Sequence, residues 1–81
     1  MTKIEKRLKK FFRNPDSLKY YEIETLLYQF GFQKLEAKGS HTKFILQNPP
    51  YRLIIPIHGH DCKPFYKIKT ARILKILCDF K

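Results

Sequence analysis

The sequence predicts an α+β fold in which a helix, three antiparallel strands and a last helix follow an additional N-terminal helix. Two observations lead to this prediction. Apolar residues recur at helical spacing near both ends of the chain, and they alternate at every second position in between. The 81 residues suffice for one modest core. We therefore expect a single domain, with residues 3–14 as the extra helix and residues 20–81 as an α-β-β-β-α core.

The first helix is expected between Lys3 and Arg13. The apolar residues that share one of its faces are Ile4, Leu8, Phe11 and Phe12. Its other positions are rich in lysine, which makes it a basic amphipathic helix. Because it is short and stops at Asn14-Pro15-Asp16, we expect it to dock onto the domain and not to lie on a membrane surface.

A second helix is expected before Gly31, which can end it in the left-handed conformation. Asp16 and Ser17 are the candidate caps at its start. The predicted core residues of this helix are Ile23, Leu26, Leu27 and Phe30.

Between Phe32 and Ile57 the apolar period becomes two, which predicts three strands. The residues expected to face the helices are Leu35, Phe44, Leu46, Leu53 and Ile55. The residues expected on the outer face are Lys34, Lys38, His41, Lys43 and Arg52, with the apolar pair Ile45 and Ile54. The outer face is thus predicted to be a positively charged surface with one titratable imidazole, and the apolar pair could mark a partner's footprint.

The last helix is expected from about Ile68 to Asp79. Its expected buried residues are Ile73, Leu74 and Leu77, with Phe80 as a further candidate, and its expected exposed residues are Lys69, Arg72 and Lys75. Lys63 and Lys67 are then expected just before its start, where backbone N–H groups also favour anions.

The charge is strongly unbalanced. Seventeen Lys and Arg against seven Asp and Glu give a formal net charge of +10, which favours a polyanionic partner. Nucleic acid fits best, because each neutralised phosphate releases condensed counterions. An acidic protein partner and a merely soluble basic surface are the alternatives.

The sequence also predicts the compartment. Its two cysteines, Cys62 and Cys78, cannot form a disulfide framework, and the chain starts without the apolar segment of a secretion signal. The longest apolar stretch, residues 53–57, is too short to cross a bilayer. We therefore expect a cytoplasmic protein without a membrane partner.

The strongest candidate site is Gly39-Ser40-His41, where a turn becomes a strand and Lys38 and Lys43 flank the imidazole. A histidine in that position can exchange a proton near neutral pH, and ammonium groups beside it can hold a phosphate. A histidine at a strand end more often has no catalytic role, so the motif alone does not decide.

A second cluster, His58, His60, Asp61 and Cys62, contains four side chains that can ligate a metal. No second Cys or His cluster lies at a recognised zinc spacing, so we predict neither a metal nor a small-molecule cofactor. For His58 we favour a structural role in the loop, with assistance to catalysis as the alternative.

The predicted architecture suits RNA. A double-stranded-RNA-binding domain has this order of elements and contacts successive grooves with the loop between its first two strands and the start of its last helix. The expected RNA-binding residues at these two places are Lys38, Gly39, Ser40, Lys43, Lys67, Lys69 and Arg72.

Four short motifs then occur in order: Gly31-Phe32, Gly39-Ser40-His41 followed by Phe44, Ile55-Pro56-x-His58, and Thr70-x-Arg72-Ile73-Leu74. From Tyr20 to Leu77 the chain thereby resembles the HicA toxins, small proteins of bacterial toxin–antitoxin pairs. Two departures are Lys69, where a glycine is usual, and the N-terminal helix, which only longer members have.

The resemblance implies an endoribonuclease that cleaves messenger RNA, with His41 as the catalytic residue and a HicB-like antitoxin as the protein partner. RNA carries its own nucleophile, so such cleavage requires proton transfer and charge stabilisation but no metal. The competing hypothesis is a non-catalytic RNA-binding module of the double-stranded-RNA-binding type. A DNA-binding factor is less favoured because the sequence has no clear recognition-helix signature.

Overall fold

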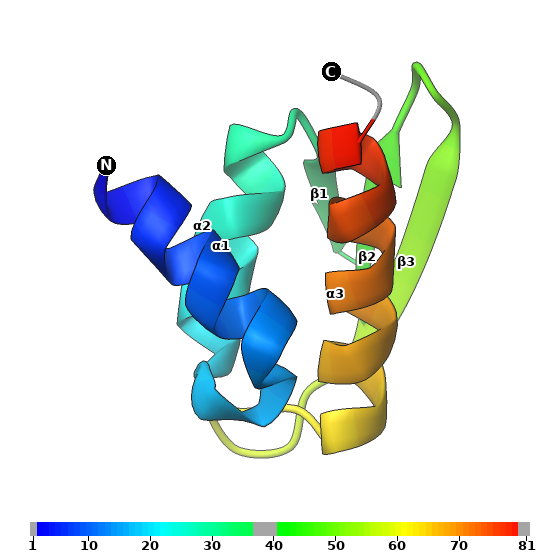
Figure 1. The fold of residues 1–81 in the computed structure, drawn as a ribbon. Coiled ribbons are helices and arrows are strands. Elements are labelled where there is room, and N and C mark those ends of the chain that lie inside the picture. The colour runs from blue at the N-terminus through cyan, green and yellow to red at the C-terminus, as the bar shows by residue number, and fades with distance from the viewer. Residues whose placement is uncertain (1, 37–40, 80–81) are drawn as a thin grey trace.

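The structure, a computed structural model, describes residues 2–36 and 41–79. Its elements in chain order are α1 (Lys3–Arg13), the 3₁₀ turn η1 (Pro15–Ser17), α2 (Tyr20–Gln29), β1 (Gln33–Glu36), β2 (His41–Leu46), β3 (Tyr51–Pro56) and α3 (Pro64–Asp79). The strands form one antiparallel sheet in the order β1-β2-β3. Helices α2 and α3 cover one face of this sheet, and α1 packs on the far side of the helical layer (Figure 1). The predicted α+β fold with an additional N-terminal helix is confirmed.

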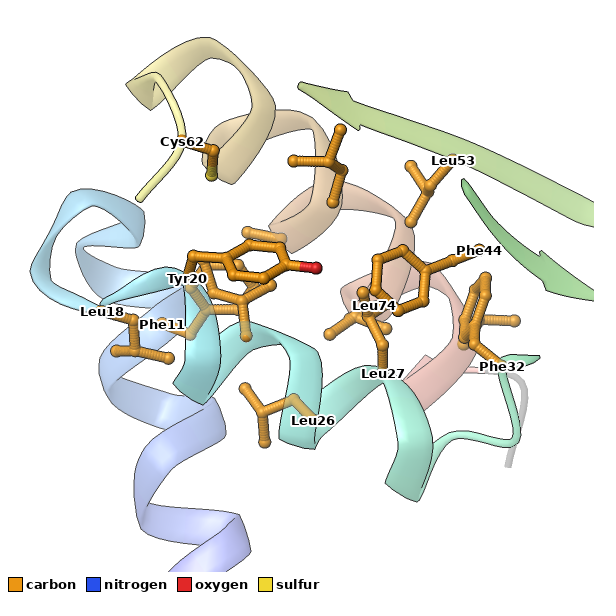
Figure 2. Packing of buried hydrophobic residues seen from close by; sticks show 14 residues of the cluster. Phe11, Leu18, Tyr20, Leu26, Leu27, Phe32, Phe44, Leu53, Cys62 and Leu74 are labelled. Carbon is orange, nitrogen blue, oxygen red and sulfur yellow. The ribbon is translucent and has the colours of Figure 1, made fainter. Parts of the chain in front are cut away.

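The core lies between the sheet and the helices. Phe44 of β2 and Leu53 of β3 point towards Leu27 of α2 and Leu74 of α3 (Figure 2), and all four side chains are buried. Strand positions 44, 53 and 55 therefore face inward as predicted, and Ile54 between them is 50% exposed. One face of β2 and β3 is thus covered by helices, which leaves their opposite face for function.

Helix α1 is docked onto the domain, as its pattern predicts. The side chain of Phe11 is fully buried, and Ile4, Leu8 and Phe12 pack against the same core. A capping box starts the helix, because the Thr2 hydroxyl accepts a hydrogen bond from the Glu5 backbone N–H at 3.1 Å and the Glu5 carboxylate accepts one from the Thr2 N–H. Its apolar stripe is therefore used for folding, and its lysines remain outside.

The start of α2 differs from the prediction. Asp16 and Ser17 belong to η1, and the helix begins only at Tyr20. The Tyr20 N–H instead donates to the Asp61 carboxylate at 3.0 Å, a partner 41 residues further along the chain. Local sequence cannot reveal a cap that arrives from that distance. The end of the helix is as predicted, because Gly31 has φ 97° and leaves the helix in the left-handed conformation.

The predicted parity of β1 is wrong by one residue. Lys34 pairs with Phe44, and Leu35 pairs with Lys43. Directly opposite residues of antiparallel strands lie on the same side of the sheet. Lys34 therefore lies on the helix side, where its Nζ is 3.2 Å from the Glu24 carboxylate, whereas Leu35 lies on the outer face and is 45% exposed. A shift of one residue inverts every side chain of a strand, so Lys34 does not belong to the basic outer face.

Helix α3 also begins earlier than predicted, at Pro64 instead of about Ile68. Proline suits the first position of a helix, because its φ is already helical and its missing N–H would have no helical partner there. The earlier start adds one helical turn and moves Lys67 inside the helix. Leu74 and Leu77 are buried and Ile73 is half-buried, whereas Phe80 lies outside the described residues. Over the described ranges, no helix combines the length and the apolar character that crossing a membrane requires.

Candidate catalytic and RNA-binding site

His41 is the first residue of β2, and its side chain is exposed. Its backbone lies opposite Pro56 of β3. Three residues later the buried Phe44 anchors the same strand in the core, next to the edge of Tyr28. An exposed imidazole is therefore mounted on a strand that is paired and packed, which is a rigid support for a proton-transfer group. Ala37, Lys38, Gly39 and Ser40 lie outside the described residues, so their predicted roles stay predictions.

Lys43 is the nearest described cation to His41 on the same face of β2. Residues two positions apart on a strand lie on one side of the sheet, about 7 Å apart. Lys43 is half-buried, and among the described residues it takes part in no ion pair. Its charge is thus available to an anion that lies beside His41.

The outer sheet face consists of the residues that point away from the helices: Gln33, Leu35, His41, Lys43, Ile45, Arg52 and Ile54. Leu35 and Ile54 lie on either side of Lys43, and Arg52 lies opposite Ile45. Arg52 is four positions along the strands from His41, or about 13 Å. The predicted grouping of Arg52 with His41 on this face is correct.

Lys69 and Arg72 lie elsewhere, on the exposed surface of α3. Together with Phe65, Ile68 and Ile73 they line a hollow of about 480 Å³. Phe65 is 66% exposed and stands edge-on to Tyr66, with the ring centroids 5.1 Å apart. Since α3 covers the inner face of the sheet (Figure 1), these two cations are on the opposite side of the sheet from His41. The structure therefore separates the predicted RNA-binding residues into two groups.

The prediction that Lys67 contacts RNA does not fit the structure. Lys67 is only 3% exposed, and its ammonium donates to the Leu18 carbonyl at 2.8 Å and to the Asp61 carboxylate at 3.1 Å. The Asp16 carboxylate lies 3.6 Å away. A helix that starts at Pro64 places Lys67 on the buried stripe, which continues through Thr70, Ala71, Leu74 and Leu77. This helical spacing from a proline start was the sequence signal that could have identified Lys67 as an interior residue.

Asp61 is the centre of this internal network. Its carboxylate accepts hydrogen bonds from the backbone N–H groups of Tyr20 and Cys62 as well as from Lys67. Burial alone raises the pKa of the Asp61 carboxyl. The hydrogen bonds and the charge of Lys67 outweigh it, so the pKa lies below its ordinary value. Asp61 thus links α2 and α3 as an ionised carboxylate.

The residues of the candidate metal cluster do not converge. Asp61 is turned towards Lys67, and Cys62 is buried, which raises the pKa of its thiol. Across residues 2–36 and 41–79, no three His, Cys, Asp or Glu side chains are arranged to hold a metal ion.

His58 and His60 are both exposed in the loop between β3 and α3. The loop is held by backbone hydrogen bonds between His58 and Asp61, and Gly59 turns it with φ 66°. Within the described part of the chain, no hydrogen bond or ion pair involves either imidazole. The favoured structural role of His58 is therefore performed by its backbone and not by its side chain.

His41 lies at the end of the sheet from which the chain leads into α3. His41 is opposite Pro56, the last residue of β3, and the chain reaches the start of α3 at Pro64. Figure 1 shows the loop between Pro56 and Pro64 at the lower end of the molecule, where it passes below α2 and returns to the start of α3.

Comparison with known proteins identifies the family. A family model described as HicA toxin of bacterial toxin-antitoxin matches residues 20–69, which is more than half of the 81-residue chain. The matched region runs from α2 into α3 and contains His41, Lys43 and His58, whereas α1 lies outside it. Searches of curated proteins and of solved structures found no significant match. The chain belongs to the HicA family of toxins from bacterial toxin–antitoxin systems.

Proposed function

We propose that this toxin is a metal-independent endoribonuclease that cleaves messenger RNA in the cytoplasm, with His41 as its catalytic residue. The observation that supports this proposal best is the position of His41. It is an exposed imidazole at the start of a paired strand, within the part of the chain that matches the toxin family. Beside it on the strand is Lys43, which has no ion pair with any described residue.

The chemistry follows from the substrate. The ribose 2′-hydroxyl attacks the adjacent phosphorus, the bond from phosphorus to the 5′-oxygen breaks, and the products carry a 2′,3′-cyclic phosphate and a 5′-hydroxyl. One proton leaves the 2′-oxygen and one must reach the departing 5′-oxygen. His41 performs one of these transfers, a contribution of about 10²–10⁴-fold for a general acid or base. The Lys43 ammonium stabilises the charge that develops on the phosphoryl oxygens.

The remaining RNA contacts are assigned to the two places at one end of the molecule. Lys38, Gly39 and Ser40 directly precede His41 and hold the scissile phosphate, whereas Lys69 and Arg72 on α3 bind the RNA further along. Lys67 is excluded because it is buried. A chain of RNA that passes around this end meets both groups of cations, and each phosphate that they neutralise adds to the affinity.

The cognate antitoxin is proposed to cover the outer sheet face. Leu35 and Ile54 are large exposed apolar residues there, and Lys43 and Arg52 give the same face its positive charge. An acidic, HicB-like partner with apolar anchors would bury these residues and shield His41. Glu22 is an acidic residue in the first turn of α2. A complex with the antitoxin on that side of α2 and His41 open to solvent would contradict this account.

The test is expression in a bacterial host with growth and messenger-RNA integrity as readouts. Wild type should arrest growth and fragment messenger RNA, whereas H41A should do neither. H60A is a matched control, because His60 is also an exposed histidine but is not placed at the site; it should behave as wild type. Equal toxicity of wild type and H41A would remove His41 from the mechanism. Intact RNA in the presence of wild-type toxin that binds it would support the non-catalytic RNA-binding module instead.

A further inference from the structure

His58 lies at the same end of the sheet as His41, and we propose that it is the second catalytic residue, which exchanges the other proton of the cleavage reaction. This inference rests on the proposed ribonuclease function and extends it from one histidine to two. The strand register limits the distance between the two histidines, backbone hydrogen bonds hold the loop of His58, and its imidazole is exposed.

The register limits the distance between the two histidines. His41 lies opposite Pro56, and opposite Cα atoms in an antiparallel pair are at most about 5.5 Å apart. His58 is two residues beyond Pro56, which adds at most about 7 Å. The Cα atoms of the two histidines are therefore within about 13 Å, a gap that two imidazole side chains and one phosphate group can span. For His60 the corresponding limit is about 20 Å, so its position is not tied to His41.

The backbone of His58 is held firmly. Its N–H donates to the Asp61 carbonyl at 2.8 Å, and the Asp61 N–H donates back to the His58 carbonyl at 3.3 Å. The carboxylate of Asp61 is itself fixed by Tyr20, Cys62 and the buried Lys67. Lys67 thereby acts at a distance from the RNA, as a positioning residue for the turn that carries His58.

The imidazole of His58 has no structural role that the described residues reveal. It is exposed, and neither a hydrogen bond nor an ion pair to described residues engages its ring nitrogens. In the same loop the carboxylate of Asp61 and the thiol of Cys62 are turned inward. His58 thus combines a fixed backbone with ring nitrogens that are available for proton transfer.

The reaction balances with two histidines. A neutral imidazole accepts the proton of the attacking 2′-hydroxyl, and a protonated imidazole donates a proton to the 5′-oxygen as its bond to phosphorus breaks. The cyclic phosphate leaves with no net change in the number of protons on the pair, although their positions are exchanged. No metal, oxidant or further reactant is required.

The first experiment compares purified wild type, H58A and H60A on an RNA oligonucleotide that wild type cleaves. We expect a bell-shaped dependence of kcat on pH for wild type and H60A. In H58A, kcat should fall by about 10²–10⁴-fold and one limb of the bell should disappear, with RNA affinity unchanged. Because the His58 ring is exposed and makes no hydrogen bond or ion pair with described residues, H58A and H60A should unfold at the same temperature, which excludes misfolding as the cause. A kcat for H58A within about threefold of that for H60A, with both limbs retained, would overturn the proposal.

The second experiment assigns the roles. At the bond that wild type cuts, the 5′-oxygen is replaced by sulfur, a leaving group that needs no proton. The variant that lacks the general acid should recover on this substrate, and the variant that lacks the base should not. Rescue of only one of H41A and H58A supports the pair, whereas failure to rescue either contradicts it. A wild type that leaves RNA intact would refute the ribonuclease proposal itself. If RNA cleavage is lost in H41A but retained in H58A, only this inference is refuted.

Discussion

Two lysines of α3, separated by one residue, lie in different environments. Lys67 is 3% exposed and bonded to Leu18 and Asp61, whereas Lys69 is exposed at the rim of a hollow and has no ion pair among the described residues. One cation stabilises the junction of η1, α2 and α3, and the other is available to a phosphate. The count of seventeen Lys and Arg therefore overstates the number of cations offered to RNA, because Lys67 is used inside the fold.

The largest expected effect comes from removing the inner lysine. K67A removes the ammonium group from the Leu18 carbonyl and leaves the Asp61 carboxylate with its two backbone donors only. Breaking a buried ion pair in this way typically costs about 3–5 kcal/mol. The Asp61 side chain is 37% exposed and can be partly rehydrated, so we expect a loss of about 3 kcal/mol in the free energy of unfolding. K69A should change it by less than about 0.5 kcal/mol. Urea unfolding of both variants measures the difference, and equal losses would refute the comparison.

The outer cations should control RNA binding. In an H41A background, which prevents cleavage, K69A/R72A should weaken binding and lower the slope of log affinity against log salt by about 2, one for each lost phosphate contact. K34A is the control, because Lys34 is a cation paired with Glu24 on the helix side of the sheet. If K34A reduced the salt slope as much as K69A/R72A, the division into inner and outer cations would be wrong.

The inner network should also appear in the pH dependence of stability. Because the pKa of Asp61 is lowered in the folded state, the unfolded chain binds more protons at acidic pH. The stabilisation is therefore complete well above about pH 4, near the pKa of an unfolded aspartate, and is lost as the pH falls through the lower folded value. D61N should flatten this part of the profile of unfolding free energy against pH. An unchanged acid slope would show that Asp61 is not ionised in the network.

The smallest expected effect tests the strand register. Leu35 lies on the outer face and is 45% exposed, so L35K should change the free energy of unfolding by less than about 0.5 kcal/mol. If Leu35 pointed into the core, burial of a charge there would cost several times more. The same variant should weaken antitoxin binding, because it removes an apolar anchor from the outer sheet face.

The sequence was sufficient where the pattern is local and strongly periodic. The α+β class, the burial of Phe44, Leu53 and Ile55, the left-handed Gly31 and the docking of α1 all follow from such patterns and are confirmed. The parity of β1 could not be read in the same way, because an edge strand of four residues with one Lys and one Leu fits either face. In the structure Lys34 lies on the helix side of the sheet, where it pairs with Glu24.

The site was predictable only in part for a related reason. His41 and Lys43 share a face because strand period alone places them there. The burial of Lys67 depends on a helix start at Pro64 and on Asp61 and Leu18, which come from other parts of the chain. The cap of α2 by Asp61 is equally non-local. Contacts between distant segments have no signature in a single sequence.

The most direct test of the central claim is the chemistry of the cut RNA ends. Purified wild type, incubated with messenger RNA in the presence of a chelator, should produce fragments that end in 2′,3′-cyclic phosphate and begin with 5′-hydroxyl. H41A, with the same unfolding temperature and the same RNA affinity, should produce none. Cleavage by H41A at the wild-type rate, or wild-type fragments that begin with 5′-phosphate, would contradict the assignment of His41 as the residue that moves the proton.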